Sequence, residues 1–347
     1  MKVINTCPFN LKDGKTRILW EITPACNMKC KHCLFFSNNK DFNLKALSTD
    51  EIFKIIDNIS KDSSLNAIWL SGGEPLLRKD IVEICKYISS KKIIPSISTN
   101  GVLMTPELAK KLYEAGVNYI HLSIDGSTPE THDRLRGVDG AFEKLMKAIK
   151  ILKDSPIKIG ASFMVTDESI NEIEEVVKIA IDNKLQVMSF YLVAKLGRGA
   201  ENFKKDDKSL EEKLLEKMSI INKKPIKDLK IEIFRVKKEE EEKVLQECKG
   251  YNFMNITYDG KLGACPWLMK SSFGFDVGSL LKEDFLELKE KCVSKMKEQI
   301  EKRKNSVELC KKCTYRDNCG RGCLALQIDD KNSKYYGVDP LCQMIKK

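Results

Sequence analysis

The sequence predicts an α/β protein in which a parallel β-sheet, covered by helices, is followed by a smaller cysteine-rich part. The main observation is that strand-like and helix-like segments alternate six times before residue 200. Such alternation is typical of parallel sheets whose strands are joined by helical crossovers. The second observation is the use of thirteen cysteines, of which eight lie within residues 248–347. In a chain without a secretion signal, this usage indicates metal or redox chemistry rather than a disulfide framework.

Length and composition bound the remaining possibilities. With 347 residues, 42% of them hydrophobic, the chain can form one large domain and a smaller one. It lacks the apolar run of about 20 residues that a membrane-spanning helix needs. Its first residues also lack the apolar region of a signal peptide, so we expect a cytoplasmic protein. The formal charge of +10 mostly reflects solvated helix surface, but it also suits an acidic peptide or small molecule. No motif indicates nucleic-acid binding.

The predicted strands are short runs rich in β-branched and aromatic residues. The first is 16–23 (TRILWEIT), and the second, 67–71 (AIWLS), is continuously apolar, as expected for a strand buried on both faces. The remaining four strands are expected at 94–99, 119–124, 157–165 and 187–193.

The predicted helices fill the gaps between these strands. The first begins after Ser48, which has the capping-box spacing to Glu51. Cys85 is expected on the apolar face of the second helix, as a core residue. The later helices are expected at 80–90, 106–115, 140–153 and 169–183. Charged residues dominate 200–247, which we expect to connect two domains.

Three cysteines follow the first strand with the spacing C-x3-C-x2-C: Cys26, Cys30 and Cys33. Cubane iron–sulfur clusters are usually held by four thiolates. Three closely spaced cysteines would leave one iron open to a small molecule. A zinc site is the alternative, but it needs a fourth ligand, and His32 is poorly placed to supply one between two of the cysteines.

A second run, Gly72-Gly73-Glu74-Pro75, comes directly after the second strand. Glycines let a backbone approach a ligand closely, and the carboxylate of Glu74 beside them can receive a cationic group. A tight strand-to-helix turn would use the same residues. Since the ends of parallel strands share one edge of a sheet, this run is expected near the cysteines.

Together, the three cysteines and the GGEP run one βα unit later resemble the signature of radical S-adenosylmethionine (radical SAM) enzymes. The resemblance implies a partial (β/α)6 TIM-like barrel over residues 17–199 and a [4Fe-4S] cluster on the three cysteines. In that family the amino and carboxylate groups of S-adenosylmethionine chelate the fourth iron. An electron from the cluster then releases a 5′-deoxyadenosyl radical. The GGEP run would hold the ammonium of the ligand.

The same resemblance implies further ligand contacts at strand ends. Ser123 and Arg136 would contact the ribose and the methionine carboxylate, although Arg136 could equally form a surface salt bridge. Asn100 and Asp125, which also follow predicted strands, are further candidates for cofactor binding. The segment 196–199 could present its backbone to the adenine.

The C-terminal cysteines resemble the seven-cysteine pattern of SPASM domains, which bind auxiliary iron–sulfur clusters. A pair of zinc ribbons is the alternative for C-x2-C spacings. The pattern implies one auxiliary [4Fe-4S] cluster on Cys310, Cys313, Cys319 and Cys342. It implies a second on Cys248, Cys265 and Cys323, one ligand short. Neither Cys7 nor Cys292 matches the position of the missing ligand. The implied domains are 1–16 (N-terminal segment), 17–199 (barrel), 200–247 (linker) and 248–347 (SPASM).

The chain departs from the pattern of one group of SPASM-containing enzymes, and this departure narrows the expected reaction. Sulfatase-maturing members have an aspartate after the cysteine equivalent to Cys265, whereas this chain has Pro266 and then Trp267. That speaks against oxidation of serine or cysteine to formylglycine. Trp267 would line the substrate cavity or belong to the core.

We therefore expect a radical SAM oxidoreductase acting on an unactivated C–H bond, with a ribosomally made peptide as the first choice of substrate. Only 25 residues precede Cys26, too few for a leader-binding domain, so a separate leader-peptide recognition protein is expected. The electron donor would be a flavodoxin or ferredoxin. The alternative is decarboxylation or side-chain removal on a tetrapyrrole, since 132–144 and 197–202 resemble haem-biosynthesis members. A non-catalytic electron carrier is a third reading, which the GGEP run disfavours.

Overall fold

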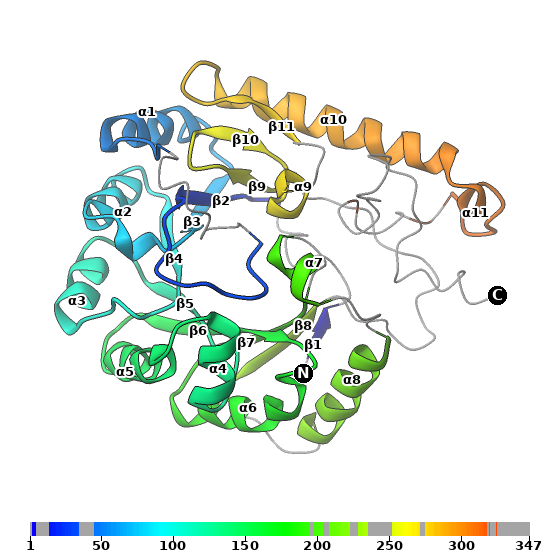
Figure 1. Cartoon of the computed structure of the whole chain (residues 1–347). Helices are drawn as coiled ribbons and strands as arrows, with labels where there is room; N and C mark the ends of the chain where they lie inside the picture. Colours follow the sequence, from blue (N-terminus) through cyan, green and yellow to red (C-terminus); the bar gives the residue numbers. More distant parts are fainter. Residues whose placement is uncertain are drawn as a thin grey trace.

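The computed structural model describes residues 2–4, 14–34, 45–193, 197–203, 208–222, 228–234, 252–270, 275–317, 319 and 324. Its centre is a curved sheet in which six parallel strands follow one another in sequence order (Figure 1). These strands are β2 (Thr16–Thr23), β3 (Leu65–Gly72), β4 (Ile94–Thr99), β5 (Tyr119–Ser123), β6 (Lys158–Val165) and β7 (Val187–Leu192). The predicted α/β class and six-strand repeat are therefore confirmed.

The sheet extends beyond the six predicted strands at both edges. At one edge β8 (Lys230–Phe234) pairs in parallel with β7, and β1 (Lys2–Ile4) pairs in parallel with β8. At the other edge β9 (Phe253–Ile256) pairs in parallel with β2 and is followed by the antiparallel strands β10 (Lys261–Gly263) and β11 (Asp276–Ser279). The stretch 200–247, expected as a connection, thus contributes β8 to the barrel sheet, while its charged run at 237–243 lies outside the described residues.

Helices cover the outer face of the sheet (Figure 1). The capping box predicted at Ser48 and Glu51 is present at the start of α1 (Thr49–Ile59). An additional helix, α4 (Pro129–Arg136), forms between the predicted strand 119–124 and the predicted helix 140–153. The other barrel helices are α2 (Ile81–Ser90), α3 (Pro106–Glu114), α5 (Ala141–Lys153), α6 (Ile173–Asp182) and α8 (Lys208–Asn222), with short turns η1 (Pro75–Leu77) and η2 (Ile170–Glu172). The remaining helices are α7 (Arg198–Asn202), α9 (Pro266–Lys270), α10 (Phe285–Ser306) and α11 (Glu308–Lys311).

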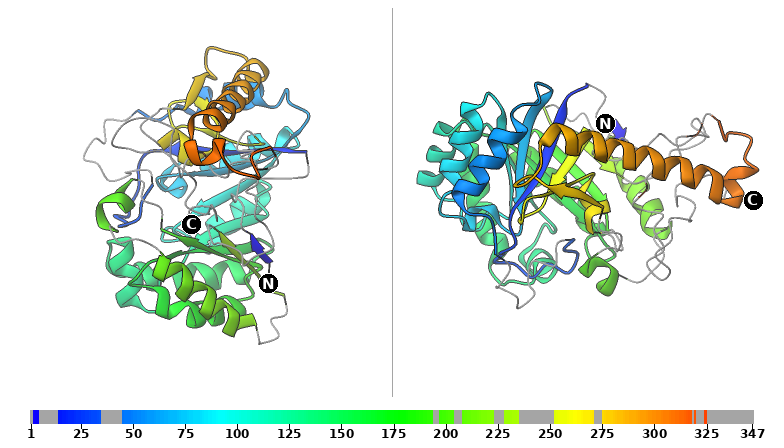
Figure 2. Two further views of the ribbon diagram at one scale, coloured as in Figure 1. Left: turned by 90° about the vertical axis from the view of Figure 1, so that its right-hand side faces the viewer. Right: turned by 90° about the horizontal axis from the view of Figure 1, so that it is seen from above.

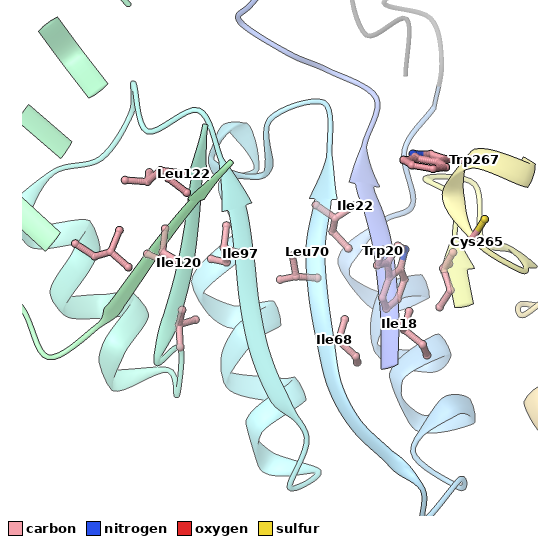
Figure 3. Close-up of a cluster of buried hydrophobic side chains, with 14 of the residues drawn as sticks. Ile18, Trp20, Ile22, Ile68, Leu70, Ile97, Ile120, Leu122, Cys265 and Trp267 are labelled. Carbon is pink, nitrogen blue, oxygen red and sulfur yellow. The ribbon is translucent and has the colours of Figure 1, made fainter. Parts of the chain in front are cut away.

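The core lies between the sheet and its helices. On β2, Ile18, Trp20 and Ile22 are at most 1% exposed and point to the helix side, and Cys265 and Trp267 pack near them (Figure 3). Burying one such large side chain stabilises a fold by about 1.5–3 kcal/mol. Because side chains alternate along a strand, the residues between these positions point into the barrel. Cys85 of α2 is fully buried in the same core, as predicted.

The long helix α10 lies over β10 and β11 and extends beyond the barrel (Figures 1 and 2). Its Lys289 Nζ donates to Asp62 Oδ2 at 2.5 Å and to Thr16 Oγ1 at 2.8 Å. The side chain of Asn58, on α1, accepts a hydrogen bond from the backbone N–H of Phe285 at 3.0 Å. These contacts fasten the C-terminal region to the first βα unit. Cys292 of α10 is fully buried and belongs to the main core.

In the described part of the chain, no helix is both long and apolar enough to cross a bilayer.

Two glycines lie against the loop 24–34 that follows β2. Gly137 has φ +69°, and a Cβ there would come within 2.6 Å of the carbonyl oxygen of Lys29. Gly197 has φ +58°, and a Cβ there would come within 2.4 Å of the carbonyl oxygen of Cys33. Real Cβ atoms do not approach an oxygen this closely, so both positions need glycine for space as well as for backbone conformation.

We predict that Lys289→Ala lowers the thermal unfolding temperature of the protein. The substitution leaves Asp62, whose side chain is 8% exposed, without its cation, at a cost of about 1–3 kcal/mol. Lys297→Ala, at an exposed position of the same helix, is the matched control. Equal unfolding temperatures for the two variants would contradict this account of α10 docking.

We also predict that Gly137→Ala destabilises the protein more than Gly140→Ala. Both glycines have φ near +70°, at +69° and +73°, so both substitutions carry the left-handed backbone penalty of about 1–2 kcal/mol. Only Gly137 touches another loop, since nothing lies within 4 Å of a Cβ built at Gly140. The difference between the two urea-unfolding free energies therefore measures the contact with the loop 24–34. A difference of zero would show that this contact does not constrain the fold.

Candidate functional site

The three cysteines of the loop 24–34 gather in one small apolar cluster at the carboxyl ends of the strands. Cys30 is 7% exposed, and Cys26 and Cys33 are half-buried. The cluster also contains Met28, Val102, Val138 and Ala141. Val102 comes from the segment after β4 and Val138 from the segment after α4, so parts of the chain distant in sequence complete the cluster.

The backbone of this loop is held by its neighbours. The amide groups of Lys29 and Lys31 each donate to a carbonyl in the last turn of α4 at 2.9 Å. On the other side, the amide of Arg198 in α7 donates to the carbonyl of Cys33 at 3.0 Å. The segment expected to face an adenine is therefore engaged with the cysteine loop through its described residues.

The GGEP run lies directly beside the start of the cysteine loop. The amide of Gly73 donates to Thr23 O, and the amide of Glu74 donates to Ala25 O, both at 2.8 Å. A Cβ at Gly73 would lie 2.0 Å from Ala25 O. The close approach that requires glycine here is an approach between two protein loops, and Pro75 then begins η1.

The carboxylate of Glu74 joins the ends of β3 and β4. Its side chain is buried, at 1% exposure, and Oε1 accepts from Leu76 N at 3.0 Å and from Thr99 Oγ1 at 2.7 Å. Oε2 accepts from Asn100 N at 2.8 Å. Burial raises the pKa of Glu74, while these hydrogen bonds act in the opposite direction. Sequence reasoning did not identify Thr99, although it is the last residue of β4.

Asn100 connects this edge of the sheet to the cysteine loop. Its Nδ2 donates to Asn27 Oδ1 at 2.7 Å, and its Oδ1 accepts from Val102 N at 3.0 Å. Asn27 lies between the first two cysteines, so the predicted cofactor-binding residue Asn100 is brought to the predicted cluster site.

Asp125 is the centre of a buried charged network. Its Oδ1 accepts from Met164 N at 2.8 Å, and its Oδ2 lies 2.6 Å from Arg136 Nε and 3.2 Å from His32 Nε2. Although burial acts to raise the pKa of Asp125, the Arg136 and His32 side chains lower it overall. Arg136 is only 9% exposed, so the alternative of a surface salt bridge is wrong: the pair is buried.

Arg136 also reaches a cysteine. Its Nη1 lies 3.5 Å from Cys30 Sγ, with hydrogen-bond geometry. Burial raises the pKa of Cys30, and the neighbouring guanidinium opposes that shift. Burial likewise raises the pKa of Cys26 to about 12. Because thiolates are the species that bind metals, metal binding here must release protons.

Two histidines complete the network, and sequence reasoning did not identify their contacts with Asp125. Burial lowers the pKa of His32 to about 4, so the ring is neutral at pH 7 and lies against Asp125 rather than acting between the cysteines. His132 Nδ1 accepts from the backbone amide of Asp125 at 3.2 Å, and burial lowers its pKa to about 4 as well.

Aromatic side chains occupy the inner face of the barrel and were not identified from the sequence. Trp69 stacks with Tyr119 and with His121 at centroid distances of 5.9 and 6.0 Å, and Phe253 meets it edge-on. Ser123, the predicted ribose contact, is half-buried on the same face of β5, two residues beyond His121. The alternating pattern of YIHLS could have predicted which residues face the inside of the barrel, because every second residue is polar or aromatic.

The C-terminal cysteines are only partly described. Cys265 is 1% exposed and belongs to the main core. Cys310, Cys313 and Cys319 are half-buried, and the amide of Cys313 donates to Cys310 O at 3.4 Å. Three predicted ligands, Cys248, Cys323 and Cys342, lie outside the described residues.

No three His, Cys, Asp or Glu side chains of the described residues converge on a point that could hold one metal ion. In a cubane cluster each thiolate binds a different iron, so its ligands need not converge.

Residues 20–180 match the family described as "Radical SAM superfamily". The Fe-coproporphyrin III synthase of Methanosarcina barkeri is 28% identical, over 97% of this chain and 90% of its own length. The AdoMet-dependent heme synthase of the same organism is 35% identical, over 53% of this chain. The mycofactocin maturase MftC of Mycolicibacterium smegmatis is 32% identical, over 48% of this chain. The chain spans about half the length of the heme synthase, at 52%, and 42% of the maturase.

Solved structures share the fold. Streptococcus suis SuiB bound to S-adenosylmethionine superposes with a TM-score of 0.76 at 20% identity, covering 95% of this chain and 77% of SuiB. The enzyme anSMEcpe with bound AdoMet superposes with a TM-score of 0.68 at 19% identity, covering 95% of this chain and 94% of that one. Residues 20–180, which hold the cysteine loop and most of the six-unit barrel, therefore form a radical SAM domain.

Proposed function

We propose that this enzyme acts on a tetrapyrrole, at an unactivated C–H bond of a carboxylate-bearing side chain, in a decarboxylation or side-chain removal. The observation that carries this proposal is the similarity to the Fe-coproporphyrin III synthase over 97% of this chain. The matches to the heme synthase and the maturase cover only about half of it. The proposal takes up the tetrapyrrole alternative of the sequence analysis in place of its first choice.

Cys26, Cys30 and Cys33 are proposed to hold a [4Fe-4S] cluster. When bound, the cluster supplies the electron that cleaves S-adenosylmethionine and yields the 5′-deoxyadenosyl radical. The apolar surroundings of the three thiols and the Arg136 guanidinium beside Cys30 support this assignment. The protein shields Cys30 from water, and Arg136 would compensate part of the negative charge that thiolate ligands bring.

S-adenosylmethionine is proposed to bind where the GGEP run, Asn100, Ser123, Asp125 and Arg136 surround the cysteine loop. In support, Asn100 is bonded to Asn27 of the cysteine loop, and Asp125 is joined to Cys30 through Arg136. The Glu74 carboxylate is fixed by three hydrogen bonds before any ligand arrives. A fixed carboxylate loses no side-chain entropy when it meets an ammonium group.

The C-terminal cysteines are proposed to bind two auxiliary [4Fe-4S] clusters, in a SPASM region at 248–347. One set would be Cys310, Cys313, Cys319 and Cys342, and the other Cys248, Cys265 and Cys323. Their spacing supports this proposal, as does the turn that brings Cys310 and Cys313 together at the end of α11. A flavodoxin or ferredoxin would supply the electrons.

Charge and surface chemistry are consistent with a carboxylate-bearing aromatic substrate. The formal charge of +10 favours approach of an anion. The side chains of Trp69, Tyr119 and His121 lie on the inner side of the barrel and stack with one another, which gives this side an aromatic lining suited to a conjugated ligand.

A peptide substrate is the second candidate. It is favoured by the 32% identity to a protein named as a maturase, and it would require a separate leader-peptide recognition protein. A purely electron-carrying role is set aside because residues 20–180 form a domain of a superfamily of enzymes.

We predict that replacing Cys26, Cys30 and Cys33 together by alanine removes about one third of the iron from anaerobically reconstituted protein, since one of three cubane clusters is lost. The variant should form no 5′-deoxyadenosine from S-adenosylmethionine. Iron analysis and chromatography measure the two outcomes. The double variant Cys85→Ala, Cys292→Ala changes two buried core thiols and should keep both properties. Continued formation of 5′-deoxyadenosine by the triple variant would disprove the proposed cluster site.

We predict that the reconstituted enzyme, given S-adenosylmethionine and a reductant, removes carboxyl-bearing side chains or their carboxyl groups from iron tetrapyrroles with acetate and propionate substituents. Mass spectrometry should detect the shortened product together with 5′-deoxyadenosine. The methyl esters of the same tetrapyrroles are the control and should not react. If the acids are left unchanged while S-adenosylmethionine is still cleaved, the tetrapyrrole proposal is wrong, and peptides become the class to test.

A further inference from the structure

Arg136 occupies a position that the expected contact with S-adenosylmethionine does not explain. It is the last residue of α4, and its guanidinium lies between a carboxylate and a thiol. Nε is 2.6 Å from Asp125 Oδ2, and Nη1 is 3.5 Å from Cys30 Sγ. The residue is 9% exposed, so both contacts are made away from water.

This geometry is fixed from three sides. The backbone carbonyl of Arg136 accepts a hydrogen bond from Lys29 N at 2.9 Å, which ties the helix end to the cysteine loop. Asp125 is itself held by Met164 N at 2.8 Å and lies 3.2 Å from His32 Nε2. Arg136 Nε and Asp125 Oδ2 are close but not aligned for a hydrogen bond. The carboxylate therefore acts on the guanidinium mainly through its charge.

The charge of an iron–sulfur cluster becomes more negative by one when the cluster is reduced. Hydrogen bonds to the ligating sulfurs, net charge and solvent exposure all set its reduction potential. A donor or cation beside a thiolate ligand stabilises the reduced state more than the oxidised state, and a buried carboxylate does the opposite. Such interactions are stronger in a dry interior than in water.

We propose that Arg136, positioned by Asp125, sets the reduction potential of the cluster on Cys26, Cys30 and Cys33 through its hydrogen bond to Cys30. This inference rests on the proposed cluster site. The two residues are expected to have opposite effects on the reduction potential of the cluster. The guanidinium of Arg136 raises it, and the carboxylate of Asp125 lowers it while holding the guanidinium in place. Arg136 is thus a positioning residue that acts through a ligand of the cluster.

The test is the midpoint potential of the cluster in reconstituted protein without S-adenosylmethionine, followed by electron paramagnetic resonance. Carrying the measurement out in the absence of S-adenosylmethionine separates an effect on the cluster from an effect on ligand binding. The auxiliary cysteines remain unchanged in every variant. Iron content and unfolding temperature are recorded for each variant.

Arg136→Gln should shift the potential downward, and Asp125→Asn should shift it upward. Arg136→Lys keeps the positive charge but loses the guanidinium group that faces both Asp125 and Cys30. Its midpoint potential should therefore lie between those of the wild type and Arg136→Gln. Arg134→Gln is the matched control, because Arg134 is two residues away on α4 and forms an exposed ion pair with Glu168. It should leave the potential unchanged. If Arg136→Gln does not retain iron, the Lys and Asn variants carry the comparison.

An unchanged potential in the Arg136 variants, or shifts of the same sign at Arg136 and Asp125, would overturn the inference. Loosening of the loop would move both potentials in one direction, since both variants would admit water. Loss of S-adenosylmethionine affinity with an unchanged potential would leave Arg136 as a ligand contact only. A wild-type protein that takes up no cluster on these cysteines would instead disprove the proposed function itself.

Discussion

The candidate site depends on backbone contacts between the loop 24–34 and three other loops at the same edge of the barrel. Gly73 and Glu74 bond to its beginning, the last turn of α4 bonds to its middle, and Arg198 bonds to its end. The bonded partners are 49 to 165 residues apart in the sequence. The positions of the thiols are therefore a property of the assembled barrel rather than of the cysteine motif.

Two buried carboxyl groups at this edge show how the type of partner decides the direction of a pKa shift. Glu74 is surrounded by neutral donors, and burial raises its pKa. Asp125 faces Arg136 and His32, and its pKa is lowered although burial acts upward. Neutral donors compensate only part of the desolvation of a carboxylate, whereas a buried cation can exceed it. Asp125 consequently keeps a full negative charge within reach of the cysteine loop.

Much of the barrel could be predicted because its signals are local. The segment 16–23 is rich in β-branched and aromatic residues, and it forms β2 with the predicted bounds. The helix α4 was missed although Thr128, Pro129 and Gly137 are ordinary cap, first-turn and terminating residues. The strand β8 was missed because charged residues dominate the surrounding sequence, while its alternating KIEIF pattern is short.

The sequence allowed most residues of the site to be predicted, but not the hydrogen bonds between their side chains. Glu74, Asn100 and Asp125 could be predicted because each comes just after a predicted strand, and parallel strands present their carboxyl ends at one edge of the sheet. That Glu74 would accept from Thr99, or that Arg136 would reach Cys30, depends on side-chain directions fixed only by packing. Pairings of this kind have no signature in spacing, since the two partners lie 25 and 106 residues apart.

The parallel pairing of β2 with β9 has a consequence for how the protein is made. β2 is the first strand of the six-strand series, but one of its two edges is completed only by residues 253–256. During synthesis that edge remains open until most of the chain has left the ribosome, and open strand edges are templates for aggregation. A fragment cut before β9 would keep β2 exposed permanently. The pairing with β9 thus connects the cysteine-rich region directly to the strand that leads into the cysteine loop.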